Sequence, residues 1–181
     1  MHNLWHNTIY REGVFAQVCY VAAQIMVWTF IIQYADHLGI NKATAQMYNI
    51  VAMSLNLLGR FVGTYIMRYV NTRRLLTIFG VGASLCTLGA ICIEGMGGLY
   101  SLVCISLFMS IMFPTIFALS LNGLGVNETK RGSSFLIMSI VGGAIAPVLM
   151  GVIGETNMAI GFIIPLICFI VIALFACKLL R

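Results

Sequence analysis

The chain has 181 residues, of which 61% are hydrophobic and 8% are charged, and its formal net charge is +5. A soluble domain of this size carries about 25% charged residues, so the composition excludes an ordinary water-soluble protein. The basic residues are scattered in ones and twos, which excludes a phosphate-binding stripe and with it a nucleic-acid partner. We therefore expect the chain to lie in a lipid bilayer.

Long apolar stretches follow one another along the chain, and each has about the 20 residues that a helix needs to cross a bilayer. Six spans are expected, at Val14–Ala35, Ala45–Met67, Leu75–Ile93, Gly98–Asn122, Gly132–Gly154 and Met158–Cys177. The short loops between them predict antiparallel neighbours and one bundle over residues 14–181. Because hydrocarbon offers no partner to an open sheet edge, an all-α membrane fold is predicted.

The charged residues alternate between the two ends of the predicted bundle. One end holds most of the basic residues, namely Arg11, Arg68, Arg73, Arg74, Lys130, Arg131, Lys178 and Arg181. The other end holds Lys42 with Asp36, Glu94 and Glu155. Because loops rich in Lys and Arg stay in the cytoplasm, both termini should be cytoplasmic. Residues 1–13 lack the apolar core of a removable signal peptide and are expected to form a cytoplasmic lead-in.

The spans differ in polarity, which predicts their place in the bundle. The sixth has no Ser, Thr, Asn, Gln or charged residue, and the third has only Thr77, Ser84 and Thr87. Spans one, two, four and five carry the larger polar groups and most of the glycines. A lipid-facing helix tolerates few polar groups, whereas a helix that lines a wet cavity can hold them. We therefore expect spans one, two, four and five around a cavity, with three and six outside.

The first span carries side chains of the types that bind sugars. Gln17, Gln24 and Trp28 fall close to one helical stripe, with Tyr20 beside them. An indole stacks on a sugar ring and an amide hydrogen-bonds its hydroxyl groups, so Gln24 and Trp28 are candidate sugar contacts. The same spacing also suits a structural interpretation, in which Gln24 bonds a neighbouring helix and Trp28 only packs.

The second span repeats this pattern with Asn49, Met53, Asn56 and Arg60 in steps of four, three and four. Asn49 and Asn56 are further candidate sugar contacts. Arg60 is a charge well inside a span and costs at least ~2.5–3.5 kcal/mol there if unpaired, and we favour a structural or gating role for it. It lies within Gly59–Gly63, a GxxxG spacing that lets two helices approach closely.

Spans four and five contain helix-disturbing residues. Pro114 removes a backbone hydrogen bond and should kink or loosen span four near mid-membrane. Gly142 and Gly143 form a smooth face of span five before Pro147. Interrupted helices rich in Gly and Pro are typical of a transporter's binding region, although simple close packing explains the two glycines equally well.

The titratable residues limit the chemistry. All carboxylates lie at span edges or in loops, as Glu12, Asp36, Glu94, Glu128 and Glu155. Proton coupling needs a titratable group inside the membrane, so a coupling acid would have to belong to another polypeptide segment. The six cysteines form no CxxC, and neither a metal nor a cofactor is predicted. GxSG, HExxH and paired embedded acids are missing, so we do not expect an enzyme.

Several motifs occur in the order found in a known family. They are Arg11-Glu-Gly-Val, Trp28-Thr-Phe-Ile-Ile-Gln-Tyr34, Gly59-Arg-Phe-Val-Gly-Thr64, Phe113-Pro-Thr-Ile-Phe117 and Lys130-Arg-Gly-Ser-Ser-Phe135. Over nearly the whole chain, this pattern resembles the second half of the fucose:proton symporter family within the major facilitator superfamily. The resemblance implies helices seven to twelve of a twelve-helix transporter of the bacterial inner membrane, arranged as two inverted three-helix repeats.

The resemblance also implies partners and residue roles. A missing amino-terminal six-helix half would carry the proton-coupling carboxylates and face this half across a central sugar cavity. Trp28 falls at the family's pocket-facing Trp, and Asn49 at a polar position of the next helix. Gly59–Gly63, together with Arg73 and Arg74, matches an inner loop motif whose charge contacts change as the halves rock, which implies a gate.

The identity of the sugar stays open between related hexoses. The fucose-transporting pattern has Gln-Tyr before the proline of span four, where this chain has Met112-Phe113. L-Fucose and a proton are the expected substrates, and glucose or galactose is the alternative. A different class is a stand-alone six-helix module that transports nothing by itself.

Overall fold

The computed structural model describes residues 7–93, 95–154 and 161–180, and within these ranges every regular element is a helix. The elements are α2 (Thr8–His37), α3 (Lys42–Ile66), α4 (Thr72–Cys92), α5 (Met96–Met109), α6 (Met112–Leu121), α7 (Val126–Met138), the 3-10 turn η1 (Ser139–Val141), α8 (Gly142–Gly154) and α10 (Ile163–Leu180). The predicted all-α fold is confirmed. Residues 158–160 of the predicted sixth span lie outside the described residues.

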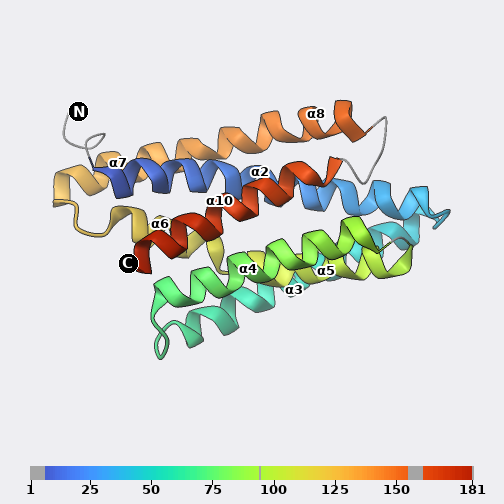
Figure 1. The fold of residues 1–181 in the computed structure, drawn as a ribbon, viewed down its shortest axis with the longest axis horizontal. Helices are drawn as coiled ribbons and strands as arrows, with labels where there is room; N and C mark the ends of the chain where they lie inside the picture. Colours follow the sequence, from blue (N-terminus) through green and yellow to red (C-terminus); the bar gives the residue numbers. More distant parts are fainter. Residues whose placement is uncertain (1–6, 94, 155–160, 181) are drawn as a thin grey trace.

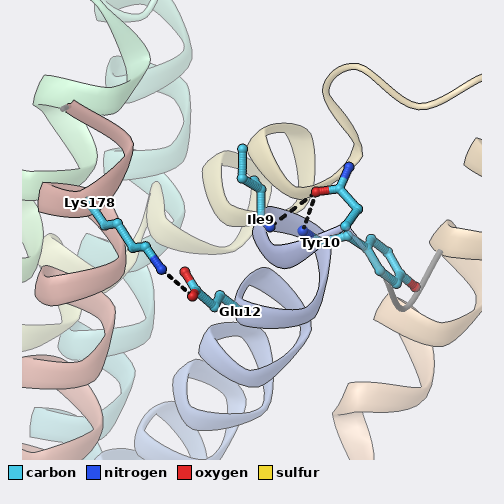
Figure 2. Close-up of polar contacts among 5 residues, drawn as sticks. Ile9, Tyr10, Glu12 and Lys178 are labelled. Carbon is cyan, nitrogen blue, oxygen red and sulfur yellow. Dashed lines mark hydrogen bonds and ion pairs between the residues drawn. The ribbon is translucent and has the colours of Figure 1, made fainter. Parts of the chain in front are cut away.

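The first three helices each begin at an asparagine. The side chain of Asn7 accepts hydrogen bonds from the backbone N–H groups of Ile9 (3.1 Å) and Tyr10 (3.4 Å), as Figure 2 shows. Asn41 and Asn71 cap α3 and α4 in the same way. An N-cap amide satisfies backbone donors that have no partner inside the helix. Helix α2 therefore starts within the expected lead-in of residues 1–13, because its cap, Asn7, lies ahead of Val14, where the predicted span begins.

Spans four and five are interrupted, as their Gly and Pro content predicts. Helix α5 ends at Met109 and α6 begins at Met112, so Ser110 and Ile111 separate them. Pro114 lies in the first turn of α6, where a missing N–H costs no helical hydrogen bond. In span five, the turn η1 separates α7 from α8, and Gly142 follows it.

Four helical segments are long and apolar enough to cross a membrane: Thr8–His37, Thr72–Cys92, Met96–Leu121 and Glu128–Val152. The described part of the last helix, Ile163–Leu179, is apolar but shorter. Helix α3 has 25 residues but is more polar, because Asn49, Asn56 and Arg60 lie in its central part. A polar helix of membrane-spanning length is expected where one side faces a cavity rather than lipid.

Helix α2 is the central element of the bundle, with α3, α5, α6, α8 and α10 packed against it (Figure 1). Its Tyr20, Met26 and Ile31 are fully buried. Helices α4 and α10 pack on each other, and α10 also packs on α2. Helix α3, in contrast, buries a narrow stripe of small residues and exposes apolar side chains such as Phe61. Apolar side chains on the outside are expected where the surroundings are lipid or another membrane segment.

Candidate functional site

A groove of about 460 Å³ lies between α2 and α3. Its lining residues are Ile25, Trp28, Thr29, Ile32, Gln33, Asn49 and Met53. Two of the four candidate sugar contacts, Trp28 and Asn49, therefore meet at one hollow although they are on different helices. The groove combines an indole, two amides and a hydroxyl with apolar walls and has no titratable lining residue. Such a surface suits a neutral ligand with several hydroxyl groups.

Trp28 is held by a residue of a third helix. Its indole Nε1 donates a hydrogen bond to the hydroxyl oxygen of Ser106 on α5, over 3.3 Å. Ser106 is fully buried, so it cannot itself contact a ligand in the groove. The bond satisfies the polar edge of the indole and sets its orientation beside the groove.

The two asparagines of α3 have different surroundings. Asn49 lines the groove, and its buried Oδ1 has no hydrogen-bond partner among the described residues. Asn56 is only 4% exposed, and its Nδ2 donates to the backbone oxygen of Ser106 over 3.0 Å. A buried polar atom without a partner is costly, and the Asn49 oxygen can accept from a ligand hydroxyl once rotation of the side chain brings it into the groove. The structure gives Asn56 a helix-packing contact, and its role as a sugar contact stays a prediction.

Gln24 lies one turn before Trp28 on α2 and is 8% exposed. It is not among the residues that line the groove between α2 and α3. Two turns earlier on the same helix, Gln17 is fully buried, and both of its side-chain polar atoms lack partners among the described residues. The polar residues predicted to share one stripe of α2 thus have different surroundings. Trp28 lies at the open groove, whereas Gln17 lies in the protein interior.

Sequence reasoning missed three residues of the site. Thr29 and Gln33 line the groove, come after Trp28 on α2 and are four residues apart from each other, which places these two on one side of the helix. This spacing was a usable signal. Ser106, which holds Trp28, lies within the apolar run of α5, where a single serine carries no pattern.

The glycines of α3 pack against the interruption between α5 and α6. A Cβ atom on Gly59 would overlap the Ser110 side chain, and one on Gly63 would overlap Ile111. Both serine and isoleucine belong to the segment that separates the two helices. The close approach predicted for the GxxxG spacing is confirmed, and it occurs where the span is broken.

Arg60 lies on the exposed side of α3, near the α5 break. Its guanidinium interacts electrostatically with the hydroxyl of Tyr20 on α2. That hydroxyl donates to the backbone oxygen of Met109, the last residue of α5, over 2.9 Å. Three helices therefore meet around one backbone oxygen at the interruption, with Arg60 as the outermost group.

The remaining candidate gating residues lie at helix contacts. Arg73, at the start of α4, donates from Nη1 to the backbone oxygen of Leu179 near the end of α10, over 3.0 Å. Its neighbour Arg74 is exposed. Gly142 packs against Val18, and a Cβ on Gly143 would overlap Ile25, so these glycines bring α8 close to α2. Arg73 thus joins the two helices that were expected on the outside of the bundle.

No protein-family model matches the chain. It is 47% identical over 173 residues to a protein of Haemophilus influenzae named L-fucose-proton symporter, a match that covers 92% of this chain and 40% of that protein. Its structure matches the crystal structure of the Escherichia coli fucose:proton symporter FucP with a TM-score of 0.92 and 35% identity, over 98% of this chain and 44% of that one. This agreement in both sequence and fold decides the family. The chain belongs to the fucose:proton symporter family of the major facilitator superfamily.

The matches fall on the carboxy-terminal half of these relatives, and the chain spans 40% of the length of the Haemophilus protein. It thus has the half-transporter architecture that the motifs implied. A second group of relatives includes the glucose/galactose transporter of Brucella abortus, which is 32% identical over 94% of this chain and 41% of that protein. Relatives named for different sugars thus match nearly the same share of this chain.

Proposed function

We propose that the chain serves as the carboxy-terminal half of a sugar:proton symporter that imports L-fucose by alternating access. The observation that carries the proposal is the groove between α2 and α3, where Trp28 and Asn49 meet in a chain 47% identical to an L-fucose-proton symporter. Transport rather than catalysis is its activity, since the relatives are transporters and the groove holds only neutral binding groups.

The groove would bind one side of the sugar. The Trp28 ring stacks on the apolar face of the pyranose, while Ser106 occupies the indole N–H. The unpartnered Oδ1 of Asn49 accepts a hydrogen bond from a sugar hydroxyl, and Thr29 and Gln33 supply further polar contacts from α2. Gln24 and Asn56 would reach the sugar only if the helices shift, because both are buried in this structure.

The opposite wall and the coupling acid would come from an amino-terminal six-helix half. Glu12, Asp36 and Glu128 all lie near helix ends, so the described carboxylates are outside the membrane interior. A titratable group that couples sugar to proton movement must lie inside it. The exposed apolar side of α3 gives this partner half, or lipid, a surface to pack on.

The membrane placement follows from the charge distribution. The chain is a multi-pass membrane protein, and we place it in the bacterial inner membrane. The start of α2 and the end of α10 would both lie on the cytoplasmic side. The basic Arg11, Arg73, Arg74 and Lys178 share that side. Accessibility of a cysteine introduced at Lys42 to a membrane-impermeant reagent on intact cells tests the orientation.

The gate would be formed by the interrupted helices and the residues packed on them. Gly59, Gly63 and Arg60 meet the break before Pro114, and Gly142 and Gly143 follow the break in span five. Short interruptions concentrate bending at defined points, so the two halves can rock around a fixed sugar. Arg73 and Arg74 would stabilise the inner end of the bundle in one of the two states.

A glucose or galactose substrate is the second candidate, and a specific observation favours it. Met112 and Phe113 replace the Gln-Tyr pair expected of fucose transport, and Phe113 packs against Tyr20 with ring centroids 6.0 Å apart. The apolar pair lacks the amide and the hydroxyl of Gln-Tyr. Neither residue lines the groove between α2 and α3, and Met112 is fully buried, so the pair would act on the sugar only from behind the groove. The Brucella abortus relative, at 32% identity, is a glucose/galactose transporter by name.

Uptake of labelled sugars tests both candidates. Cells that express the transporter containing this half should accumulate L-fucose when an inward proton gradient is imposed, and a protonophore should abolish the accumulation. Preference for D-glucose or D-galactose over L-fucose would support the second candidate. Accumulation of none of the three, with the protein present in the membrane, would contradict both and favour a module without transport activity.

A further inference from the structure

A second groove, of about 490 Å³, lies between the beginning of α2 and the end of α10, away from the sugar groove. Its charged lining residues are Arg11, Glu12 and Lys178, and its apolar ones include Phe15, Val171 and Leu174. None of these residues belongs to the candidate site or gate. The groove therefore needs an explanation of its own.

The charged residues lie at the end of the groove, and the apolar residues lie further from that end along the helices. Phe15 follows Arg11 by four residues on α2, and Leu174 precedes Lys178 by four on the antiparallel α10. Since four residues are about one helical turn, both apolar side chains lie about one turn deeper than the charges. Phe15 is 60% exposed and Leu174 is 64% exposed, so the deep part of the groove is apolar and open. A charged rim above an exposed apolar channel has the shape of a phospholipid site.

The rim carries a net positive charge. Lys178 Nζ forms an ion pair with Glu12, as Figure 2 shows, and the two charges offset each other. Arg11 is exposed and has no ion-pair partner among the described residues. Arg73 adds a second cation nearby, because its guanidinium is bonded to the backbone of Leu179, next to Lys178. Negative ligands are therefore favoured at this end of the groove.

We propose that this groove binds one anionic phospholipid, with its phosphate at Arg11, beside the Lys178–Glu12 ion pair, and an acyl chain along Phe15, Leu174 and Val171. Basic pockets between membrane helices on the cytoplasmic side recognise anionic headgroups, and this end of the bundle is the one with the positive loops. The bound lipid would bridge α2, which lines the sugar groove, and α10, which does not. It would thus stabilise the contact between these two helices at the inner end.

Native mass spectrometry of the purified chain tests the headgroup part of the proposal. The protein is released from mild detergent with phosphatidylglycerol or with phosphatidylcholine of the same acyl length, and bound lipid per chain is measured. Phosphatidylglycerol should be retained in preference. Arg11→Gln should lower its retention by about fivefold, the effect expected of one basic residue near an anionic surface. Lys42→Gln, which removes the same charge at the other end of the bundle, should leave retention unchanged.

A photocrosslinking experiment tests the apolar part and does not depend on the charge variants. Phe15 is replaced by p-benzoylphenylalanine, and membranes that contain the protein are irradiated. A lipid-sized mass increase on the chain is expected. Equal retention of the two lipids, equal effects of Arg11→Gln and Lys42→Gln, or a crosslink from position 15 to another polypeptide would each overturn the proposal, the last by showing that protein covers the groove.

Discussion

The indole Nε1 of Trp28 donates a hydrogen bond to the Ser106 hydroxyl oxygen over 3.3 Å, joining the first helix of the bundle to α5. The backbone oxygen of the same serine accepts from Asn56 Nδ2 over 3.0 Å, which adds α3 to the contact. One small, fully buried residue thus connects the three helices behind the groove between α2 and α3. The groove's geometry depends on these bonds as much as on the residues that line it.

Ser106→Ala should weaken sugar affinity without removing a sugar contact. The substitution frees the Trp28 indole, and a lost hydrogen bond of about 1 kcal/mol corresponds to roughly a fivefold higher KM for uptake. Maximal uptake should change little. Ser101→Ala is the matched control, because the Ser101 hydroxyl bonds only within its own helix, to the Gly97 oxygen. A KM that stays the same in Ser106→Ala would show that the serine does not position Trp28.

Trp28→Ala should lower sugar uptake by at least about tenfold, since stacking and apolar contact with the ring are lost together. Trp28→Phe keeps a ring for stacking but not the bond to Ser106, so its uptake should lie between the two. The amount of each variant in the membrane, measured by immunoblot, should match the unsubstituted protein. Unchanged uptake by Trp28→Ala would remove this residue from the sugar site.

Asn49 and Asn56 should respond differently to alanine. Asn49→Ala removes an acceptor that has no partner among the described residues, so it should raise the KM for sugar and leave stability nearly unchanged. Asn56→Ala leaves the buried Ser106 oxygen short of a donor and should destabilise the bundle by about 1–3 kcal/mol. Uptake kinetics and thermal unfolding in detergent separate the two effects. A stability loss in Asn49→Ala with an unchanged KM would contradict its assignment to the groove.

Gly63→Ala should destabilise the contact between α3 and the α5–α6 break. A Cβ at this position overlaps Ile111, and overpacking of a tight contact costs about 1–3 kcal/mol. Gly151→Ala in α8 is the control, because a Cβ there meets nothing within 4 Å. Thermal unfolding of both variants gives the comparison. Equal stability of the two would mean that the helices separate at little cost.

Arg60→Gln should slow transport more than it weakens sugar binding. Arg60 does not line the groove but lies beside the Tyr20 hydroxyl, which holds the last backbone oxygen of α5. A positioning role at a moving helix predicts a fall of about tenfold in maximal uptake, equivalent to ~1.4 kcal/mol, with KM changed less. Arg68→Gln, in the turn after α3, tests whether any lost charge at this end has the same effect. A KM-only change in Arg60→Gln would assign the arginine to sugar binding instead.

Much of the fold was predictable from hydrophobic run length alone. The helices follow the predicted spans, and the interruption of span four was predicted from Pro114, because proline acts on the backbone next to it whatever the tertiary structure. Boundaries were less predictable. The start of α2 at Thr8 depends on the cap formed by Asn7, which hydropathy does not detect.

The candidate site was predictable only in part. The stripe of Asn49 and Asn56 follows from helical periodicity, yet one side chain lines the groove and the other faces α5. Two residues seven positions apart point in slightly different directions from a helix. The position of the neighbouring helix then decides which of the two residues that helix covers. Ser106 has no sequence signal at all, because its role depends on a tryptophan 78 positions away.

The amino-acid sequence by itself determined the solvent, the approximate extent of the helices and the family, because each depends on composition and local order along the chain. The tertiary structure alone decided which polar groups are open to a ligand and which are used between helices. It also placed Arg11 and Lys178, from opposite ends of the chain, at one groove. Such contacts depend on how helix surfaces pack in space, and linear spacing does not contain that information.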